Sequence, residues 1–595
     1  MATEAPGKLP LWDLTRGDAA DNRSSPHGLG WRALAVSTAL EFNYLTAAIA
    51  FVSLILVPAI LVGLTVPGVM ALAHWKLKGL ELITLRPATA LISLALLVGV
   101  ALWIARPLLA MSLDNFWHLH YTLVFPLFVT LREAISAGLE WLPPRSLNPE
   151  QLHRRRRVGA LLTTILLASG GLTLASRVPF VTLFGVHDLR PTALTSAALS
   201  NALVVLGLST IVASLYWFGR EISSGHPVFN WTPGPPAPAP RTMRIAHLSD
   251  LHVVGETYGY RMESGTAGPC GNARVVQAFR ELDAIHAAHP LDRILVTGDI
   301  TDAGTRAEWL EFLALVHHWP ELRRRLLFLP GNHDVNIIDR TNPARFDVPW
   351  SVTGALRKLR VILALDAVQG GSVRVVDRTS GMLGPTLEEY LRTGNRAKLL
   401  PDLAEHGTWR ARRAVVKVWD EIFPLVALPS EESCGVVLLD SNSRRHFSLT
   451  NAIGIIDRGQ LRALNSVLQS SPGAAWIIAV HHHLVEYPIR GLGLDERAGV
   501  VLVNAADVLR VIARHDRPVL VVHGHRHRDW IGTCGDTMLC SAPSVTLGDK
   551  GSQSACGSFS LYDVAFASEG RLQLASVERV RIVSDESRSS NASGQ

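Results

Sequence analysis

Five short motifs rich in Asp, His and Asn stand in the C-terminal half of the chain, each directly after a run of strand-forming apolar residues. They are Asp250-Leu251-His252, Gly298-Asp299-Ile300-Thr301-Asp302, Gly331-Asn332-His333-Asp334, His481-His482-His483 and Gly524-His525-Arg526-His527. Carboxylate, imidazole and amide groups are metal ligands, and open α/β sheets bind ligands in the loops at the carboxyl ends of their strands. A D-x-H triplet alone is equally typical of a surface turn. Five such motifs in this order predict one metal site assembled from strand ends.

The segments between the motifs alternate between the patterns of strands and helices. Strands are predicted at 243–250, 293–297, 326–330, 475–480 and 518–522. Amphipathic helices are predicted at 273–287, where Asn272 would be the N-cap, and near 306–318. An α/β domain is therefore expected. It would follow the Pro-rich stretch 232–240, TPGPPAPAP, which favours an extended spacer.

Taken together, the five motifs resemble those of the calcineurin-like metallophosphoesterase superfamily, over roughly Met243 to Ile582. The resemblance implies an α/β fold in which a β-sandwich is flanked by helices (αββα). It also implies two divalent metal ions, for which Mn, Fe and Zn all suit the ligand types. The implied ligands of the first metal are Asp250, His252, Asp299 and His527, and those of the second are Asp299, Asn332, His482 and His525.

One ligand within the histidine triple is open to an alternative. The ligand of the family usually lies two positions before a proline, and Leu484 occupies the place of that proline here. This count selects His482 and leaves His481 as the alternative. The resemblance further implies in-line attack by a hydroxide that bridges the metals, protonation of the leaving oxygen by His333, and orientation of His333 by the Asp302 carboxylate. Arg526 could contact phosphate or belong to a solvated face.

The substrate class is suggested by a softer resemblance. The segments 435–442 and 454–464 look like the corresponding region of bacterial 3′,5′-cyclic-nucleotide phosphodiesterases of this superfamily. We therefore expect hydrolysis of a phosphodiester or phosphomonoester, with a cyclic nucleotide among the candidates. The segment of about 336–432 contributes no motif and is expected to form a cap-like insert. Two alternatives stay open: hydrolysis of a lipid-linked pyrophosphate or phospholipid headgroup, and a non-catalytic membrane sensor or transporter with a regulatory metal-binding domain.

The composition divides the chain at about Pro240. Of the 595 residues, 48% are hydrophobic and 18% charged, and the mean hydropathy is +0.22. The first 240 residues carry 17 Lys and Arg and 12 Asp and Glu residues, about 12% charged, whereas the remaining 355 carry 40 and 39, about 22%. A membrane region followed by an ordinary soluble domain explains both values.

Apolar stretches of about 20 residues predict four membrane-spanning helices. The spans are expected at about 44–73, 87–105, 158–178 and 193–218. The uncharged stretch 115–131 is interpreted as interfacial or re-entrant, with a fifth span as the alternative. The predicted organisation is a polar tail (1–41), a transmembrane region (42–219), a Pro-rich linker (220–242), the metallophosphoesterase domain (243–582) and a disordered tail (583–595).

The distribution of Lys and Arg predicts the orientation of the spans, because positively charged loops stay in the cytoplasm. Four spans with the N-terminus inside place the catalytic domain in the cytoplasm, at a bacterial-type inner membrane; a fifth span would move it outside. The arginine run 154–157 is interpreted as a topology determinant, with anionic lipid headgroups as a secondary partner. Most of the net charge of +6 belongs to this membrane half. The expected partners are therefore a phosphoester substrate and the lipid bilayer, and no nucleic acid.

Overall fold

A computed structural model of the chain describes sixteen segments in two compact units. The segments are 125–142, 149–177, 190–223, 227–228, 241–255, 271–336, 352–378, 380–405, 408–430, 434–442, 453–471, 473–487, 502–515, 517–548, 557–566 and 572–582. One unit consists of Phe42–Ser223 and the other of Met1–Glu41 with Ser224–Gln595. Each unit is described by itself.

The Phe42–Ser223 unit contains three described helices, α7 (Phe125–Glu140), α8 (Pro149–Ser176) and α10 (Pro191–Ser223). Two stretches, Glu150–Ser176 and Thr195–Ile222, are long and apolar enough to cross a membrane. They coincide with the predicted spans 158–178 and 193–218. The predicted spans 44–73 and 87–105 lie outside the described residues. The four-span topology, and with it the side of the catalytic domain, stays a prediction.

The arginine run at the start of α8 makes contacts within this unit. Arg156 Nε lies 3.1 Å from a carboxylate oxygen of Glu133 on α7 and 3.6 Å from one of Glu221 on α10. Arg155 donates to the carbonyl oxygen of Leu139, and Arg157 donates to that of Ile222. Three of the four arginines therefore bind the ends of α7 and α10 to α8, in addition to any part they play in topology.

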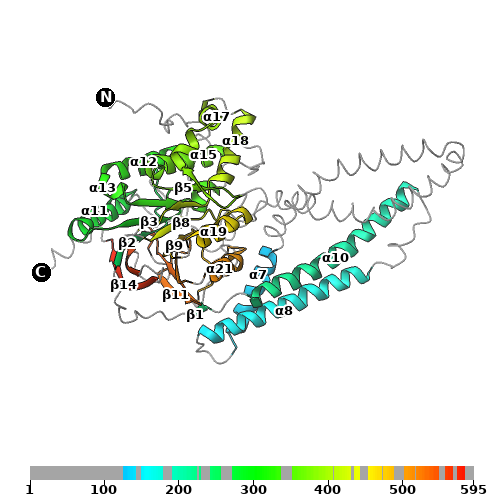
Figure 1. The fold of residues 1–595 in the computed structure, drawn as a ribbon. Coiled ribbons are helices and arrows are strands. Elements are labelled where there is room, and N and C mark those ends of the chain that lie inside the picture. The colour runs from blue at the N-terminus through cyan, green and yellow to red at the C-terminus, as the bar shows by residue number, and fades with distance from the viewer. Residues whose placement is uncertain are drawn as a thin grey trace. The chain divides into compact units, whose positions relative to one another are not determined.

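The second unit is built on two mixed sheets (Figure 1). The five-stranded sheet has the order β14-β13-β2-β3-β4, with β2 (Arg241–Leu248), β3 (Arg293–Thr297) and β4 (Leu326–Leu329) parallel and β13 (Ser558–Phe566) and β14 (Leu572–Arg581) antiparallel. The nine-stranded sheet has the order β1-β11-β12-β10-β9-β8-β7-β5-β6. Its parallel centre comprises β8 (Gly435–Leu438), β9 (Trp476–Ala479), β10 (Val519–His523) and β12 (Thr537–Ser541). Its antiparallel flanks are β1 (Pro227–Val228) and β11 (Trp530–Cys534), and β7 (Leu425–Ala427), β5 (Arg374–Val376) and β6 (Leu383–Thr386).

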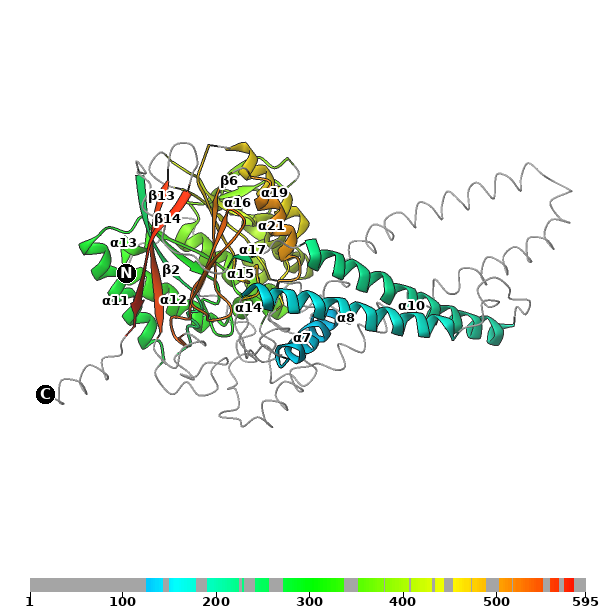
Figure 2. The same cartoon turned by 90° about the horizontal axis from the view of Figure 1, so that it is seen from below.

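Alternating side chains of the central strands fill two different cores, as expected for a sandwich. Along β8, Val436 and Leu438 belong to the core shared with the five-stranded sheet, whereas Val437 belongs to the core covered by α19 (Arg458–Ser470) and α21 (Ala505–Ala513). The five-stranded sheet is covered by α11 (Ala273–Ala288), α12 (Arg306–His318) and α13 (Pro320–Arg323). Figure 2 shows the strands between these two groups of helices. The mixed sheets are consistent with the predicted metallophosphoesterase fold.

The predicted helices after the first two motifs are present, but the cap of the first one was predicted wrongly. Thr305 caps α12 in a capping box with Glu308. Asn272 occupies the N-cap position of α11, yet its side chain makes no capping hydrogen bond. Its amide instead accepts from the backbone N–H of Val254 and donates to the carbonyl oxygen of the same residue. Asn272 therefore holds the loop that follows His252.

The segment predicted as a cap-like insert, 336–432, is largely part of the domain itself. It contributes the three strands β5, β6 and β7 to the nine-stranded sheet. Its described helices are α15 (Val352–Gln369), α16 (Leu387–Arg392), α17 (Arg396–Glu405) and α18 (Trp409–Ile422), preceded by α14 (Asn332–Asn336). Side chains of α15 to α18 lie in the central core, and Trp419 is buried and donates to the Asp440 carboxylate at 2.8 Å. Residues 337–351 lie outside the described ranges.

Strands also begin earlier than the predicted domain boundary at residue 243. β2 starts at Arg241, and β1 pairs with the edge strand β11. Part of the region predicted as a linker, 220–242, therefore adds backbone hydrogen bonds to the nine-stranded sheet.

Candidate metal centre

The predicted site residues all lie on loops at the carboxyl ends of parallel strands from both sheets. Asp250 and His252 follow β2, Asp299 and Asp302 follow β3, and Asn332 and His333 open α14 after β4; the histidine triple follows β9, and His525 and His527 follow β10. All of these side chains are buried. Segments up to 280 residues apart in the sequence thus meet at one place because parallel strands end at the same edge of a sheet.

Five of the predicted ligands have a left-handed backbone conformation. Their φ angles are 53° for Asp250, 44° for His252, 48° for Asp299, 73° for His525 and 50° for His527. No other non-glycine residue in the described ranges has a positive φ. This conformation costs about 1–2 kcal/mol for each residue that has a Cβ atom. Strain of this kind concentrates at functional sites, where the surrounding structure compensates it.

Two motif glycines make room for the ligands. Gly298 has a φ of +94°, which side chains rarely allow, and a Cβ atom there would lie 2.8 Å from Cγ of His481. A Cβ atom on Gly331 would lie 2.8 Å from Cγ of Asp299. The glycines of G-D-x-x-D and G-N-H-D are therefore required by close packing around Asp299.

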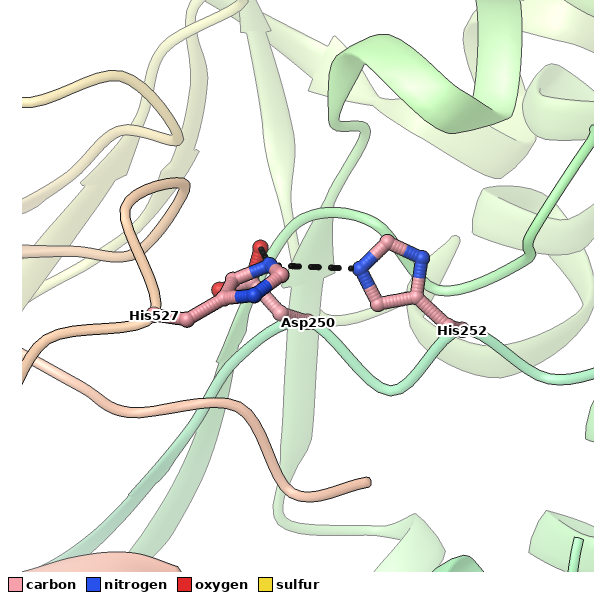
Figure 3. Close-up of side chains that lie close together, drawn as sticks. All are labelled: Asp250, His252 and His527. Atoms are coloured by element: carbon pink, nitrogen blue, oxygen red, sulfur yellow. Dashed lines mark hydrogen bonds and ion pairs between the residues drawn. The ribbon is translucent and has the colours of Figure 1, made fainter. Parts of the chain in front are cut away.

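The first ligand cluster consists of Asp250, His252 and His527 (Figure 3). The two imidazole Nε2 atoms lie 3.4 Å apart, and Nε2 of His527 lies 3.2 Å from Oδ1 of Asp250. Nδ1 of His252 lies 3.3 Å from Oδ1 of Asp302. This carboxylate lies close to Nδ1 without forming a hydrogen bond to it, and a proton on Nδ1 would leave the Nε2 lone pair for a cation, as in many metal-binding histidines.

The second cluster forms around His481. Its Nε2 lies 3.0 Å from Oδ1 of Asn332, 3.3 Å from Oδ2 of Asp299 and 3.1 Å from Nδ1 of His525. Its Nδ1 lies 2.8 Å from the carbonyl oxygen of Thr297. A carbonyl oxygen only accepts, so Nδ1 carries a proton, and Nε2 of the neutral ring has a lone pair. Because the amide and carboxylate oxygens opposite it are acceptors too, the arrangement fits a shared cation.

Asp299 joins the two clusters. Its Oδ2 lies 4.0 Å from Nε2 of His252 and 3.3 Å from Nε2 of His481. Its Oδ1 accepts a hydrogen bond of 2.8 Å from the backbone N–H of His333. Asp299 is thus placed to share one carboxylate between two cations, as the resemblance implies.

Of the histidine triple, His481 and not the predicted His482 lies against Asn332, Asp299 and His525. His481 was the alternative ligand. Nδ1 of His482 lies 2.7 Å from Oγ of Ser441, and its ring lies 4.3 Å from the ring of His525. The described clusters of metal-ligating atoms include His481 and not His482. The distance from the strand end is the signal that points to His481. It lies two residues after β9, as do Asp250 after β2, Asp299 after β3 and His525 after β10.

His333 and Asp302 are in contact, but through the backbone. Nδ1 of His333 lies 2.7 Å from the carbonyl oxygen of Asp302, whereas the Asp302 carboxylate faces His252. The ring of His333 lies edge-on to that of His252, with the centroids 4.6 Å apart. The carboxylate predicted to orient His333 therefore lies beside a ligand of the first cluster.

Without a metal, Asp299 and His481 stabilise each other's charged form, so a metal cation would compete with a proton on His481. Burial alone would raise the pKa of Asp299, but the charges of His481 and His333 and a hydrogen bond from His481 hold it well below its ordinary value. Burial alone would lower the pKa of His481, but Asp299 raises it to about 9. In contrast, burial and the neighbouring histidines lower the pKa of His525 well below its ordinary value.

Asp334, the last residue of G-N-H-D, has a place in the site that was not predicted from its motif. Its carboxylate accepts hydrogen bonds from the backbone N–H groups of Ile300, Thr301 and Gly331 and from the Thr301 hydroxyl. Burial and the charge of Asp299 raise its pKa to about 6. Asp334 ties the loops after β3 and β4 together. The signal that could have indicated this structural part of Asp334 was its place in the G-N-H-D motif, two residues after the predicted ligand Asn332.

Comparison with known proteins agrees with the motifs. Residues 243–529 match the calcineurin-like phosphoesterase family. A probable cyclic nucleotide phosphodiesterase of Coxiella burnetii is 29% identical over 105 residues, which are 18% of this chain and 37% of that protein's length. A Staphylococcus aureus protein described as a 5′-nucleotidase has a TM-score of 0.29 at 12% identity, covering 58% of this chain and 55% of its own. The sulfate thiohydrolase SoxB of Thermus thermophilus has a TM-score of 0.28 at 13% identity, and the match covers 60% of this chain and 58% of the SoxB chain.

The family match and the ligand geometry define the class of this part of the chain. Residues 243–529 match the calcineurin-like phosphoesterase family, and the described ligand residues of its motifs lie together. The described His and Asp clusters could bind metal.

Proposed function

We propose that the protein is a membrane-anchored phosphoesterase that uses two divalent metal ions, of the Mn, Fe or Zn type. The observation that carries this proposal is the carboxylate of Asp299 between two clusters of buried ligand atoms. The first site would be formed by Asp250, His252, Asp299 and His527. The second would be formed by Asp299, Asn332, His525 and a histidine of the triple, for which the distances favour His481 over His482. Bound there, the cations would supply an activated water and neutralise charge on the phosphoryl oxygens.

The chain's own residues supply orientation and a proton. The carbonyl oxygen of Thr297 holds the ring of His481 so that Nε2 faces the second cluster, and the Asp302 carboxylate lies 3.3 Å from Nδ1 of His252. The carbonyl oxygen of Asp302 keeps a proton on Nδ1 of His333, so the proton exchanged with the leaving oxygen is carried on Nε2. The His333 side chain lies among buried ligands with 7% of its surface exposed, where it can reach a bound phosphoester.

The reaction is tested with full-length protein purified in detergent and a chromogenic aryl phosphodiester. We expect Asp299→Asn to reduce the hydrolysis rate by at least 10³-fold, because two sites lose a shared ligand. Asp283→Asn, at an exposed position of α11, is the matched control and should retain the wild-type rate. Undiminished hydrolysis by Asp299→Asn would refute the two-metal assignment.

The substrate we propose first is a 3′,5′-cyclic nucleotide. The resemblance of the 435–464 region and the name of the Coxiella burnetii relative support it. The alternative is a lipid-linked pyrophosphate or phospholipid headgroup, which would give the membrane anchor a direct purpose. Steady-state kinetics with cyclic nucleotides and with nucleotide-linked lipids, in several divalent metals, separate the two. A higher kcat/KM for the lipid would displace the cyclic nucleotide.

Membrane anchoring is supported by the apolar surface of α8 and α10. Large apolar side chains are exposed along both helices, including Leu166 at 55% and Leu172 at 64% on α8 and Val212 at 65% on α10. Such a surface is unusual for a soluble protein and suits contact with lipid. The proposed location is a bacterial-type inner membrane with the catalytic domain in the cytoplasm. A reporter active on only one side of the membrane, fused after Gln595, tests it; activity on the outer side would reverse the orientation.

A further inference from the structure

The loop between the last two histidine ligands contains a buried and paired arginine. Arg526 lies between His525 and His527, and its side chain is 3% exposed. Its Nη1 lies 2.7 Å from Oε2 of Glu486, and its guanidinium carbon lies 5.0 Å from the centre of the Tyr487 ring. A guanidinium group is always charged in proteins. The Arg526 charge is thus balanced through Nη1 by a carboxylate of this chain, whereas its Nη2 is buried without a hydrogen-bond partner.

Glu486 connects this arginine to the histidine triple. Its other carboxylate oxygen, Oε1, lies 3.3 Å from Nε2 of His483. The next residue, Tyr487, donates a hydrogen bond of 2.7 Å to Ser541, and its ring stacks on that of His523 at 6.1 Å. The segment after β9 is therefore fixed to the segment after β10 by contacts that lie outside the ligand clusters.

The two connected segments each carry one imidazole of the second cluster. His481 comes five residues before Glu486, and His525 immediately precedes Arg526. Their ring nitrogens lie 3.1 Å apart, a spacing suited to two ligands of one cation. His525 also has a φ of 73°, a conformation that its surroundings must maintain.

We propose that Glu486 and Arg526 are a positioning pair that sets the spacing of His481 and His525 and thereby the affinity of the second metal site. This inference rests on the proposed function only in taking the second cluster as a metal site. One guanidinium nitrogen contacts one carboxylate oxygen of Glu486, and the other oxygen lies near His483, so the pair links the loop of His525 to the histidine triple. Replacing a residue that orients a metal ligand typically weakens metal binding about 10–100-fold.

The test measures Mn²⁺ binding to chelator-treated, full-length protein by titration calorimetry, with the metal content checked by elemental analysis. We expect Glu486→Gln and Arg526→Gln each to weaken the second Mn²⁺ site about 10–100-fold and to leave the first within about threefold. The double variant should weaken the second Mn²⁺ site little more than either single variant does, because both substitutions remove the same contact. Arg392→Gln is the control; it removes ion pairs with Asp366 and Glu388 elsewhere in the domain and should leave both affinities unchanged.

Several outcomes would overturn this inference. Wild-type affinity at both sites in both single variants would show that the pair does not position the ligands. A raised KM for Arg526→Gln with unchanged Mn²⁺ affinity would make Arg526 a substrate contact instead. If the Gln variants do not fold, Arg526→Met keeps an unbranched apolar stem beside Tyr487 and removes the charge, and an unchanged second-site affinity in this variant would equally refute the proposal. Wild-type protein that binds fewer than two Mn²⁺ ions would refute the proposed function before any variant is compared.

Discussion

Gly331→Ala should disable the candidate metal centre without replacing any ligand. A Cβ atom at this position would overlap the carboxylate and backbone nitrogen of Asp299 and lie 2.8 Å from its Cγ atom. Real Cβ atoms do not approach other atoms this closely, so either Asp299 or the loop after β4 must move. Asp299 also accepts the hydrogen bond from the backbone of His333, so its displacement affects the proton donor as well.

The size of the effect follows from the two consequences of this overlap. Adding a methyl group to a packed interior costs about 1–3 kcal/mol, which would lower the melting temperature of a domain of this size by a few degrees. A shift of about 1 Å in a catalytic group can reduce the rate about 10²-fold. Since Asp299 is proposed to serve both metals, we expect the affinity of both sites to fall at least tenfold.

Elemental analysis after dialysis, differential scanning calorimetry and aryl phosphodiester hydrolysis measure these three quantities. Gly371→Ala is the control, because the atom nearest its added Cβ would be a Glu388 carboxylate oxygen at 3.4 Å, an ordinary contact. We expect the control to keep its metals and its rate. If Gly331→Ala retained two metals and a rate within twofold of the wild type, the proposed position of Asp299 between the clusters would be wrong.

Three further predictions test other parts of the site. Because the Asp302 carboxylate faces His252, Asp302→Asn should weaken the first metal site about 10–100-fold and slow the hydrolysis of substrates with good and poor leaving groups equally. His333→Ala, which removes the proton donor, should slow substrates with poor leaving groups more. If Asp302→Asn showed the same dependence on the leaving group as His333→Ala, the assignment of Asp302 to the first metal site would be wrong. Removing metal with a chelator should lower the melting temperature, because a site filled at 100 times its Kd adds about 2.7 kcal/mol; an unchanged melting curve would count against metal binding. Burial and the charge of Asp302 raise the pKa of Glu308 to about 8, from an ordinary value of 4.5. The folded protein therefore binds the proton more tightly, and the free energy of unfolding should fall by up to a few kcal/mol as the pH rises from about 4.5 to 8. Glu308→Gln should flatten this decline in chemical denaturation, and the same slope in both proteins would refute the assignment.

The positions of the motifs were predictable from sequence because each combines two local signals. An apolar run predicts the strand, and a ligand type directly after it predicts a side chain at the sheet edge. The N-cap of α19 follows an equally local rule, because Asp457 is of a favoured N-cap type and its side chain accepts a hydrogen bond from the backbone N–H of Gly459. Both signals lie within a few residues of the feature they predict.

The features that the sequence did not reveal depend on contacts between distant segments. Asn272 is a suitable N-cap by type, but the loop after His252 lies close enough to take both polar groups of its amide. The Asp302 carboxylate faces His252 and not His333 because of how the loops after β2 and β3 meet, which no spacing within G-D-x-x-D determines. The strands of 374–427 carry no ligand motif, and their place in the nine-stranded sheet follows only from pairing with β8.

Within the histidine triple, the count from the strand end identifies the ligand better than the proline count does. Side chains of a strand point alternately to the two faces of the sheet and not toward its end. A residue in the left-handed conformation reverses the chain just past the last strand pair and turns its side chain toward the sheet edge. Asp250, Asp299 and His525 adopt this conformation two residues after their strands end. His481 has the same offset from β9 without a positive φ, so the offset alone selects it, whereas the choice of His482 depends on a proline that this chain replaces with Leu484.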